Sequence, residues 1–176
     1  MEGRNTLDIL KKIMEKGERA KEFYIQAKER AMHPLCKRVF DILAEEKGRQ
    51  LLRINQIYNA FKKGYGWRID RFLWEPGQCK KSPFENLSQI YSGFVHVWPD
   101  DLKLLDLAMK TEEEYFTFLD EMEREAIQPL ARRCYIGLSY AMRRYYLMLA
   151  DVRDYLMNPD DWLPSEERVF VDGVER

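Results

Sequence analysis

Two stretches of this chain repeat each other at a fixed offset of 95 positions, without a gap. The dipeptide Pro34-Leu35 recurs as Pro129-Leu130, and matching residues continue on both sides of it. These matches are Leu10 and Leu105, Met14 and Met109, Glu18 and Glu113, Phe23 and Phe118, Ala31 and Ala126, Arg38 and Arg133, Leu43 and Leu138, and Arg49 and Arg144. An internal duplication of this kind indicates that one supersecondary unit occurs twice in the fold.

Each copy of the repeat has the pattern of two long helices with a proline bend between them. Apolar residues recur at alternating steps of three and four, as they do along the buried face of a helix in a bundle. His33-Pro34 interrupts the first copy, because proline disfavours helical geometry in the residue before it. The stripes expected to face the core run from Leu10 to Ala31, Cys36 to Phe61, Leu105 to Ala126 and Ala131 to Leu156.

The ends of these helices are marked by capping and breaking residues. The expected helices cover residues 5–31, 34–62, 99–126 and 129–157. Asn5 or Thr6 is a suitable N-cap for the first helix, since both side chains accept hydrogen bonds from free backbone N–H groups. Gly64-Tyr65-Gly66 is expected to end the second helix.

Two hairpins joined by one long crossover predict an all-α four-helix bundle. The hairpins are expected over 5–62 and 100–157, and the crossover over 63–99. A single domain over 1–163 is expected, with an irregular tail over 164–176. The crossover is expected to pack on the bundle, because it has too many aromatic residues to leave in water. They are Tyr65, Trp67, Phe72, Trp74, Phe84, Tyr91, Phe94 and Trp98.

Composition excludes several classes of partner. The chain carries 29 Lys and Arg against 30 Asp and Glu, so its net charge of -1 gives no long-range attraction to nucleic acid or acidic membranes. No secretory signal and no membrane-spanning run is expected. Cys36, Cys79 and Cys134 share no Cys-x-x-Cys spacing, so reduced cysteines in a cytoplasmic protein are expected.

Polar residues occupy the middle of otherwise apolar stripes. Lys47 and Gln50 lie midway along the second stripe, and Glu112 lies midway along the third. A buried ammonium and a buried amide need local partners, because burying either group without a hydrogen bond costs about 2–7 kcal/mol. The repeat places these three and their counterparts near mid-height of the bundle. The six positions are Gly17, Lys47, Gln50, Glu112, Met142 and Tyr145.

Further motifs carry a family resemblance. The first helix contains Ala20-Lys21-Glu22-Phe23-Tyr24, and the last is followed by Asn158-Pro159-Asp160-Asp161-Trp162-Leu163. Glu166-Glu167-Arg168 and then Asp172-Gly173 follow in the tail. With the Pro-Leu bends, these segments resemble the rubrerythrin-type families of the ferritin-like superfamily, over residues 7–61 and 99–173. The resemblance implies a ferritin-like four-helix bundle.

The resemblance also implies a place for metal. In those families, glutamates on helices one and three and Glu-x-x-His or Glu-x-x-Glu motifs on helices two and four hold two irons, which react with peroxide or dioxygen. The six central positions correspond to those ligands, and only Glu112 among them is a carboxylate. Gly17 and Lys47 replace the glutamates of helices one and two. Because a di-iron centre needs several carboxylates, the sequence predicts neither a bound metal nor a catalytic residue.

A lysine–glutamate pair is the expected replacement for the metals. Lys47 lies at the same level as Glu112 on a facing helix, so it can neutralise the carboxylate, with Gln50 and Tyr145 completing the hydrogen bonds. In the alternative arrangement, Lys47 extends outward to solvent and Glu112 reaches a solvent channel.

Two readings of function follow from the centre of the bundle. The first is a metal-free binding or assembly scaffold without cofactor, related to rubrerythrins and expected to form a homodimer. The second is an oxidoreductase acting on peroxide or dioxygen at an atypical iron or manganese site. That site would use Glu112 and a flanking carboxylate, namely Glu18, Glu46 or Glu113, turned inward by a local bulge.

A third reading concerns the crossover. A pocket for a small molecule or a lipid beneath it would be lined by Trp67, Trp74 and Trp98, which offer large apolar surfaces with a polar edge.

Overall fold

The computed structural model describes residues 2–67 and 96–158, which form four α-helices and no strand. The helices are α1 (Glu2–Arg30), α2 (Pro34–Lys62), α4 (Pro99–Glu125) and α5 (Pro129–Met157). The expected all-α fold of four helices is therefore confirmed for these two ranges. Helix α2 ends at Lys62 and α5 ends at Met157, in agreement with the approximate bounds expected, and α4 ends at Glu125, next to the last residue of its expected stripe.

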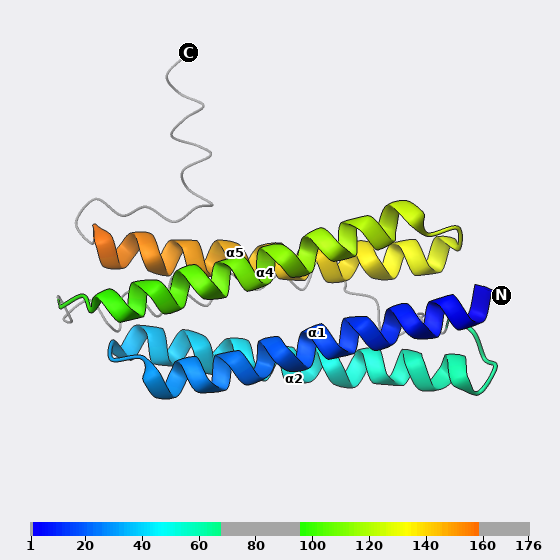
Figure 1. Cartoon of the computed structure of the whole chain (residues 1–176), viewed down its shortest axis with the longest axis horizontal. Helices are drawn as coiled ribbons and strands as arrows, with labels where there is room; N and C mark the ends of the chain where they lie inside the picture. The colour runs from blue at the N-terminus through cyan, green and yellow to red at the C-terminus, as the bar shows by residue number, and fades with distance from the viewer. Residues whose placement is uncertain (1, 68–95, 159–176) are drawn as a thin grey trace, which may run out of the picture.

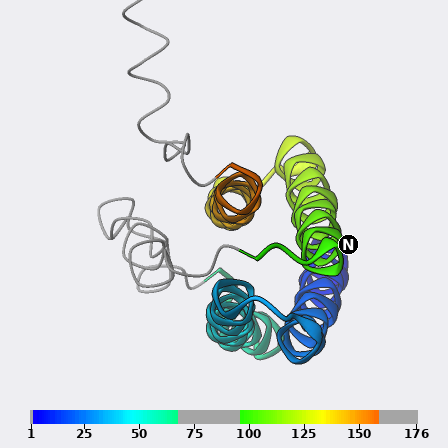
Figure 2. The same cartoon turned by 90° about the vertical axis from the view of Figure 1, so that its left-hand side faces the viewer.

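The helices pair as two hairpins that lie face to face (Figure 1). Helix α1 packs along α2, and α4 packs along α5. Seen end-on, α1 faces α4 and α2 faces α5, so the four axes surround one core (Figure 2). Helix α2 ends at the end of the molecule where α1 begins, whereas α4 begins at the opposite end (Figure 1). The end of α2 and the start of α4 therefore lie at opposite ends of the bundle.

The core consists of the stripes that the sequence predicts. Leu10, Phe40, Leu105 and Leu149, one from each helix, are fully buried. A continuous apolar cluster joins all four helices along their length. Each helix therefore stabilises the fold mainly through burial of one face, at about 25 cal/mol for each Å² of apolar surface.

Proline and glycine set the ends of α2. His33 has extended backbone geometry, and its Nδ1 accepts a hydrogen bond from the Leu35 N–H at 3.1 Å, which caps the helix whose first residue is Pro34. At the other end, Gly64 and Gly66 have φ of 79° and 67°, a region that glycine enters without steric cost. The predicted break and stop are both confirmed.

The first helix starts earlier than expected. Because α1 begins at Glu2, Asn5 and Thr6 lie within its first turns and neither is its N-cap. A capping residue favours a helix start, but it does not prevent the helix from continuing beyond it.

A carboxylate joins the two hairpins at one end. Asp101 in the first turn of α4 is 1% exposed, and it accepts hydrogen bonds from the backbone N–H groups of Met32 at 2.8 Å and His33 at 2.6 Å. The indole of Trp98 packs edge-on against the His33 ring. The bend of the first hairpin is thus fixed by the start of the second.

Other expectations concern residues outside the described ranges. Most of the crossover over 63–99, the tail over 164–176 and Cys79 lie there, as does the proposed extent of the domain to residue 163. Within the described part of the chain, no helix combines the length and the apolar character needed to cross a bilayer.

Candidate functional site

A buried ion pair lies at the centre of the helical core. The Nζ atom of Lys47 on α2 lies 2.9 Å from Oε2 of Glu112 on α4, and both residues are 0% exposed. The ammonium and the carboxylate therefore face each other across the two hairpins. Neither side chain extends to solvent, which excludes the alternative in which Lys47 points outward.

Sulfur and aromatic rings complete the surroundings of Lys47. Its Nζ donates to Sδ of Met142 on α5. It also lies 4.7 Å from the centroid of the Tyr115 ring and 5.1 Å from that of Tyr145. Aromatic faces attract a cation through the ring quadrupole, by about 2 kcal/mol where water is excluded. The ammonium thus lies in a cage built by α2, α4 and α5.

Tyr24 is the partner that the sequence analysis missed. Its hydroxyl, on α1, donates a short hydrogen bond to Oε1 of Glu112. Both carboxylate oxygens are therefore paired, one with Lys47 and the other with Tyr24. The available signal was the position of Tyr24, which lies two turns after Gly17 on the same buried stripe of α1.

Gln50 and Tyr145 were expected to form hydrogen bonds with the ion pair, but they do not. Gln50 Nε2 donates to the Tyr145 hydroxyl at 3.2 Å, so these two side chains satisfy each other one turn further along α2 and α5. The Tyr145 ring, rather than its hydroxyl, faces Lys47. The expectation was wrong in this detail because the ring places its hydroxyl beyond the ammonium.

Gly17 leaves room for the neighbouring side chains. A Cβ atom there would come within 3.0 Å of Leu51 Cδ2 and 3.4 Å of the Tyr115 hydroxyl. That hydroxyl donates to the backbone oxygen of Ile13 at 2.7 Å, which fixes the ring beneath Lys47. Lys47, Glu112 and Met142 therefore meet at one level, Gln50 and Tyr145 meet one turn further along, and neighbouring side chains fill the space at Gly17.

Burial dominates the ionisation of this site. It lowers the pKa of Lys47, and the attraction of Glu112 offsets part of that effect. Burial and the nearby negative charge of Glu112 both raise the pKa of Tyr24 and Tyr115. The tyrosines therefore stay protonated as donors well above neutral pH, which keeps the carboxylate paired.

The donor set does not suit a metal centre. One carboxylate, one thioether and an ammonium converge here, whereas iron or manganese requires several anionic oxygen or imidazole ligands. Within the two described ranges, no three His, Cys, Asp or Glu side chains come close enough to hold an ion. Glu18 and Glu113 are exposed, and Glu46 pairs with Arg49 at 2.6 Å. None of these flanking carboxylates is turned toward Glu112.

Trp67 and Trp98, the two tryptophans in the described ranges, do not share a pocket. Trp67 packs edge-on against Phe61 and Tyr135, near the end of α2 and the start of α5. Trp98 packs against His33 at the opposite end of α2. Since a helix of this length spans about 43 Å, the expected common lining by Trp67 and Trp98 is wrong. Trp74 lies outside the described residues.

Comparison of the chain with protein-family models, curated proteins and solved structures gives no match. The ferritin-like resemblance therefore depends on the residues of this chain alone.

Proposed function

We propose that this protein is a rubrerythrin-related, ferritin-like four-helix bundle that works as a metal-free scaffold for binding or assembly. The observation that carries the proposal is the pairing of Lys47 with Glu112 at 2.9 Å in a fully buried setting. An ammonium there supplies the positive charge that metal ions supply in the related families. It pairs directly with the Glu112 carboxylate.

The hydrogen bonds to both oxygens of Glu112 support the proposal. One of its oxygens is bonded to Lys47 and the other to Tyr24, so a metal would have to displace both partners. Displacing Lys47 would leave an ammonium buried without its counterion, which costs about 3–5 kcal/mol. Such a centre favours a permanent structural role over reversible metal binding.

Metal content tests this function directly. We expect the protein purified after growth with added iron or manganese to contain far less than one metal ion per chain, and to have no visible absorption band. A chelator should leave its thermal midpoint unchanged. Stoichiometric metal that is lost in the variant Glu112→Gln would overturn the proposal and favour the oxidoreductase with an atypical centre. The exposed Glu113→Gln serves as the matched control, since it lies next to Glu112 on the outer face of α4.

A further inference from the structure

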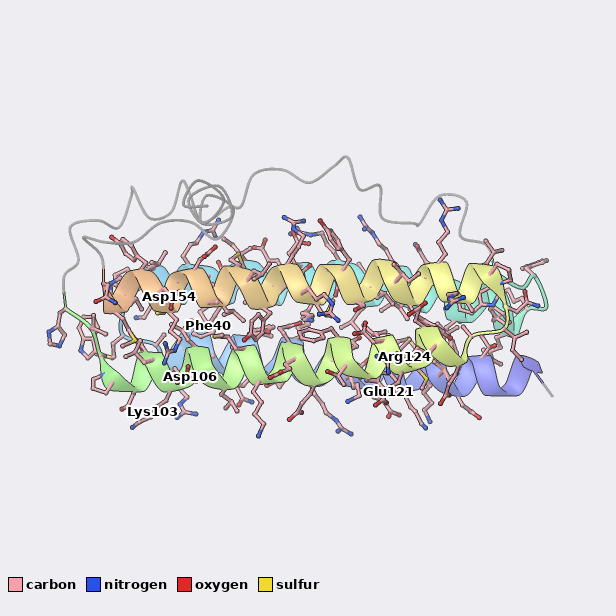
Figure 3. All side chains as sticks on the ribbon, turned by 90° about the horizontal axis from the view of Figure 1, so that it is seen from above. Phe40, Lys103, Asp106, Glu121, Arg124 and Asp154 are labelled. Atoms are coloured by element: carbon pink, nitrogen blue, oxygen red, sulfur yellow. The ribbon has the colours of Figure 1, made fainter. Side chains whose placement is uncertain are left out.

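A cavity lies at the end of the bundle where α1 begins and α4 turns into α5. Its volume is about 110 Å³, and it is partly open to solvent. Figure 3 shows this end of the molecule near Arg124, which lies in the last turn of α4. Ile9, Met122, Ala131 and Tyr135 give the cavity largely apolar walls, so a molecule with apolar surface fits it.

The internal repeat assigns a counterpart to this cavity at the opposite end of the bundle. With the offset of 95 positions, Thr6 corresponds to Asp101, and Ile127-Gln128 corresponds to Met32-His33. Thr6 and both bend residues line the cavity. In the other half of the molecule, the same place is occupied by the carboxylate of Asp101, which binds the backbone of the bend.

The two bends have the same backbone conformation. His33 has φ of -71° and ψ of 128°, and Gln128 has φ of -77° and ψ of 121°. In the first bend, two successive N–H groups donate to the two oxygens of Asp101 at 2.8 Å and 2.6 Å. The matching geometry directs the N–H groups of Ile127 and Gln128 into the cavity.

These two N–H groups have no acceptor within the described ranges of the chain. Thr6 carries no negative charge, and its side chain ends one atom nearer the backbone than that of an aspartate. The first turn of α5 has no acidic residue, and the side chain of Gln128 does not cap it. A helix N-terminus favours negative charge, so both the dipole of α5 and the two N–H groups favour an anion here.

Tyr135 supplies a third donor. It lines the cavity and is 2% exposed, and its hydroxyl forms no hydrogen bond with any described residue. Its counterpart in the repeat is Phe40, which is fully buried and lies toward the other end of the bundle (Figure 3). The fold thus accepts a ring without a hydroxyl at this position. Because buried donors are normally paired, the hydroxyl indicates an acceptor in the cavity.

The size and the charge of the cavity limit what it can hold. A closed apolar cavity of about 150 Å³ holds one benzene molecule, so this one suits a molecule with a tail of about three or four carbons. Among the described residues that line it, only Glu125 carries a charge. The Glu125 side chain is exposed, so solvent and salt screen its repulsion of an anion.

We propose that this cavity binds a small monocarboxylate with a short apolar tail. The carboxylate accepts hydrogen bonds from the two N–H groups of the bend, as Asp101 does in the other half of the molecule, and from the Tyr135 hydroxyl. The tail packs against Ile9 and Met122. This goes beyond the function proposed above and does not depend on the central ion pair, so its failure would leave the metal-free scaffold standing.

Amide chemical shifts of the full chain during titration with butyrate test the site. We expect saturable shifts at Ile127 and Gln128, and an affinity for 1-butanol that is at least about tenfold weaker, because the alcohol lacks the charge. The amides of Met32 and His33 are the internal control and should not shift, because Asp101 already binds them. Absence of saturable shifts, or equal affinity for 1-butanol, would overturn the proposal.

The variant Thr6→Asp supplies the carboxylate from within the chain. We expect it to raise the thermal midpoint and to abolish the butyrate shifts at Ile127 and Gln128. Thr6→Val is the matched control, since it keeps the shape of the side chain and adds no charge, and it should still bind butyrate. Butyrate binding that persists in Thr6→Asp would show that the ligand does not occupy the place of the Asp101 carboxylate.

The variant Tyr135→Phe tests the third donor. Butyrate should bind about two- to tenfold more weakly, the effect of one lost hydrogen bond. The thermal midpoint should not fall, because Phe40 shows that this position accepts phenylalanine. An unchanged affinity for butyrate would overturn the assignment of Tyr135 to the site.

Discussion

Gln50 and Tyr145 occupy the same position in the two copies of the repeat, and they form a hydrogen bond with each other at 3.2 Å. Lys47 and Met142 are related in the same way and are also in contact. Repeat-related residues meet only near the axis that relates the two hairpins. The two copies therefore touch through equivalent positions at the centre of the protein, and their differences there create its chemistry.

The difference between the copies is one of charge. Lys47 contacts its counterpart Met142, whereas Glu112 has Gly17 as its counterpart. A symmetric centre with four carboxylates would repel itself without metal ions. The observed centre has one charge of each sign, and the neighbouring side chains satisfy both. Divergence of the repeat has thus produced a neutral interior.

Breaking this pair should be strongly destabilising. We expect Lys47→Met and Glu112→Leu each to lower the free energy of unfolding by about 3–5 kcal/mol where the remaining group is left charged and buried. The double variant should recover most of the loss, since no buried charge remains and Met142 shows that this level accepts a thioether. Denaturant unfolding of the four proteins measures the coupling. Additive losses would mean that the two side chains act independently.

Much of this arrangement could be predicted from the sequence. The proline bends and the alternating apolar steps fix the helices through local rules, and α2 agrees with expectation over Pro34–Lys62. The repeat then aligns positions at one level, which is why Lys47 and Glu112 could be paired. Local rules did not locate the start of α1, because the helix continues past Asn5 and Thr6 to Glu2.

Other features depend on how neighbouring helices are rotated. Tyr24 reaches Glu112 because α1 packs beside α4 with that stripe facing it, and nothing in the sequence near Tyr24 specifies a partner 88 positions away. Asp101 lies in the first turn of α4, where a helix favours negative charge, but its oxygens bind the backbone of the other hairpin. Such pairings are tertiary, so a pattern within one helix cannot reveal them.

Alkaline pH should unfold the protein through its buried tyrosines. Burial raises the pKa of Tyr24 above its ordinary value of 10.0, so the folded state keeps a proton that the unfolded state releases. The stability due to this group is complete below pH 10.0 and is lost as the pH rises further. Cys134, with a pKa raised from 9.0 to about 12, adds a loss that begins near pH 9.0.

The variant Tyr24→Phe isolates one of these groups. At neutral pH its free energy of unfolding should be lower than that of the wild type by about 1.5–3 kcal/mol, the range for a hydrogen bond to a charged group. Above pH 10.0 it should fall less steeply with pH than that of the wild type. Burial lowers the pKa of Lys47, so the contribution of this residue to the free energy of unfolding rises with pH, opposite to that of Tyr24. The Tyr24→Phe comparison is therefore repeated in the background of Lys47→Met. Parallel curves for Tyr24→Phe and the wild type would contradict the assignment.

Two helical glycines should respond differently to alanine. A Cβ at Gly48 would meet only the end of the flexible Lys21 side chain, at 3.8 Å, so Gly48→Ala should stabilise the protein by about 1 kcal/mol through helix propensity. At Gly17 the same gain is opposed by Leu51 at 3.0 Å, so the net gain should be smaller or negative. Thermal midpoints measure both. An equal rise for the two variants would show that Leu51 moves aside without cost.

The hydrogen bonds from the bend of the first hairpin to Asp101 should contribute more to the free energy of unfolding than a favourable charge at a helix N-terminus does. Asp101→Ala removes the acceptor for the N–H groups of Met32 and His33, and the latter is fully buried. We expect a loss of about 2–3 kcal/mol in the free energy of unfolding, because donors are left without partners. Hydrogen exchange at these two amides should rise by more than exchange in the middle of α2.

Asp100→Ala is the matched control, since Asp100 is exposed and bonds only to the exposed Lys103 among the described residues. Equal effects of the two substitutions would mean that Asp101 acts on the helix dipole alone, and that the hairpins are not fixed to each other at this end.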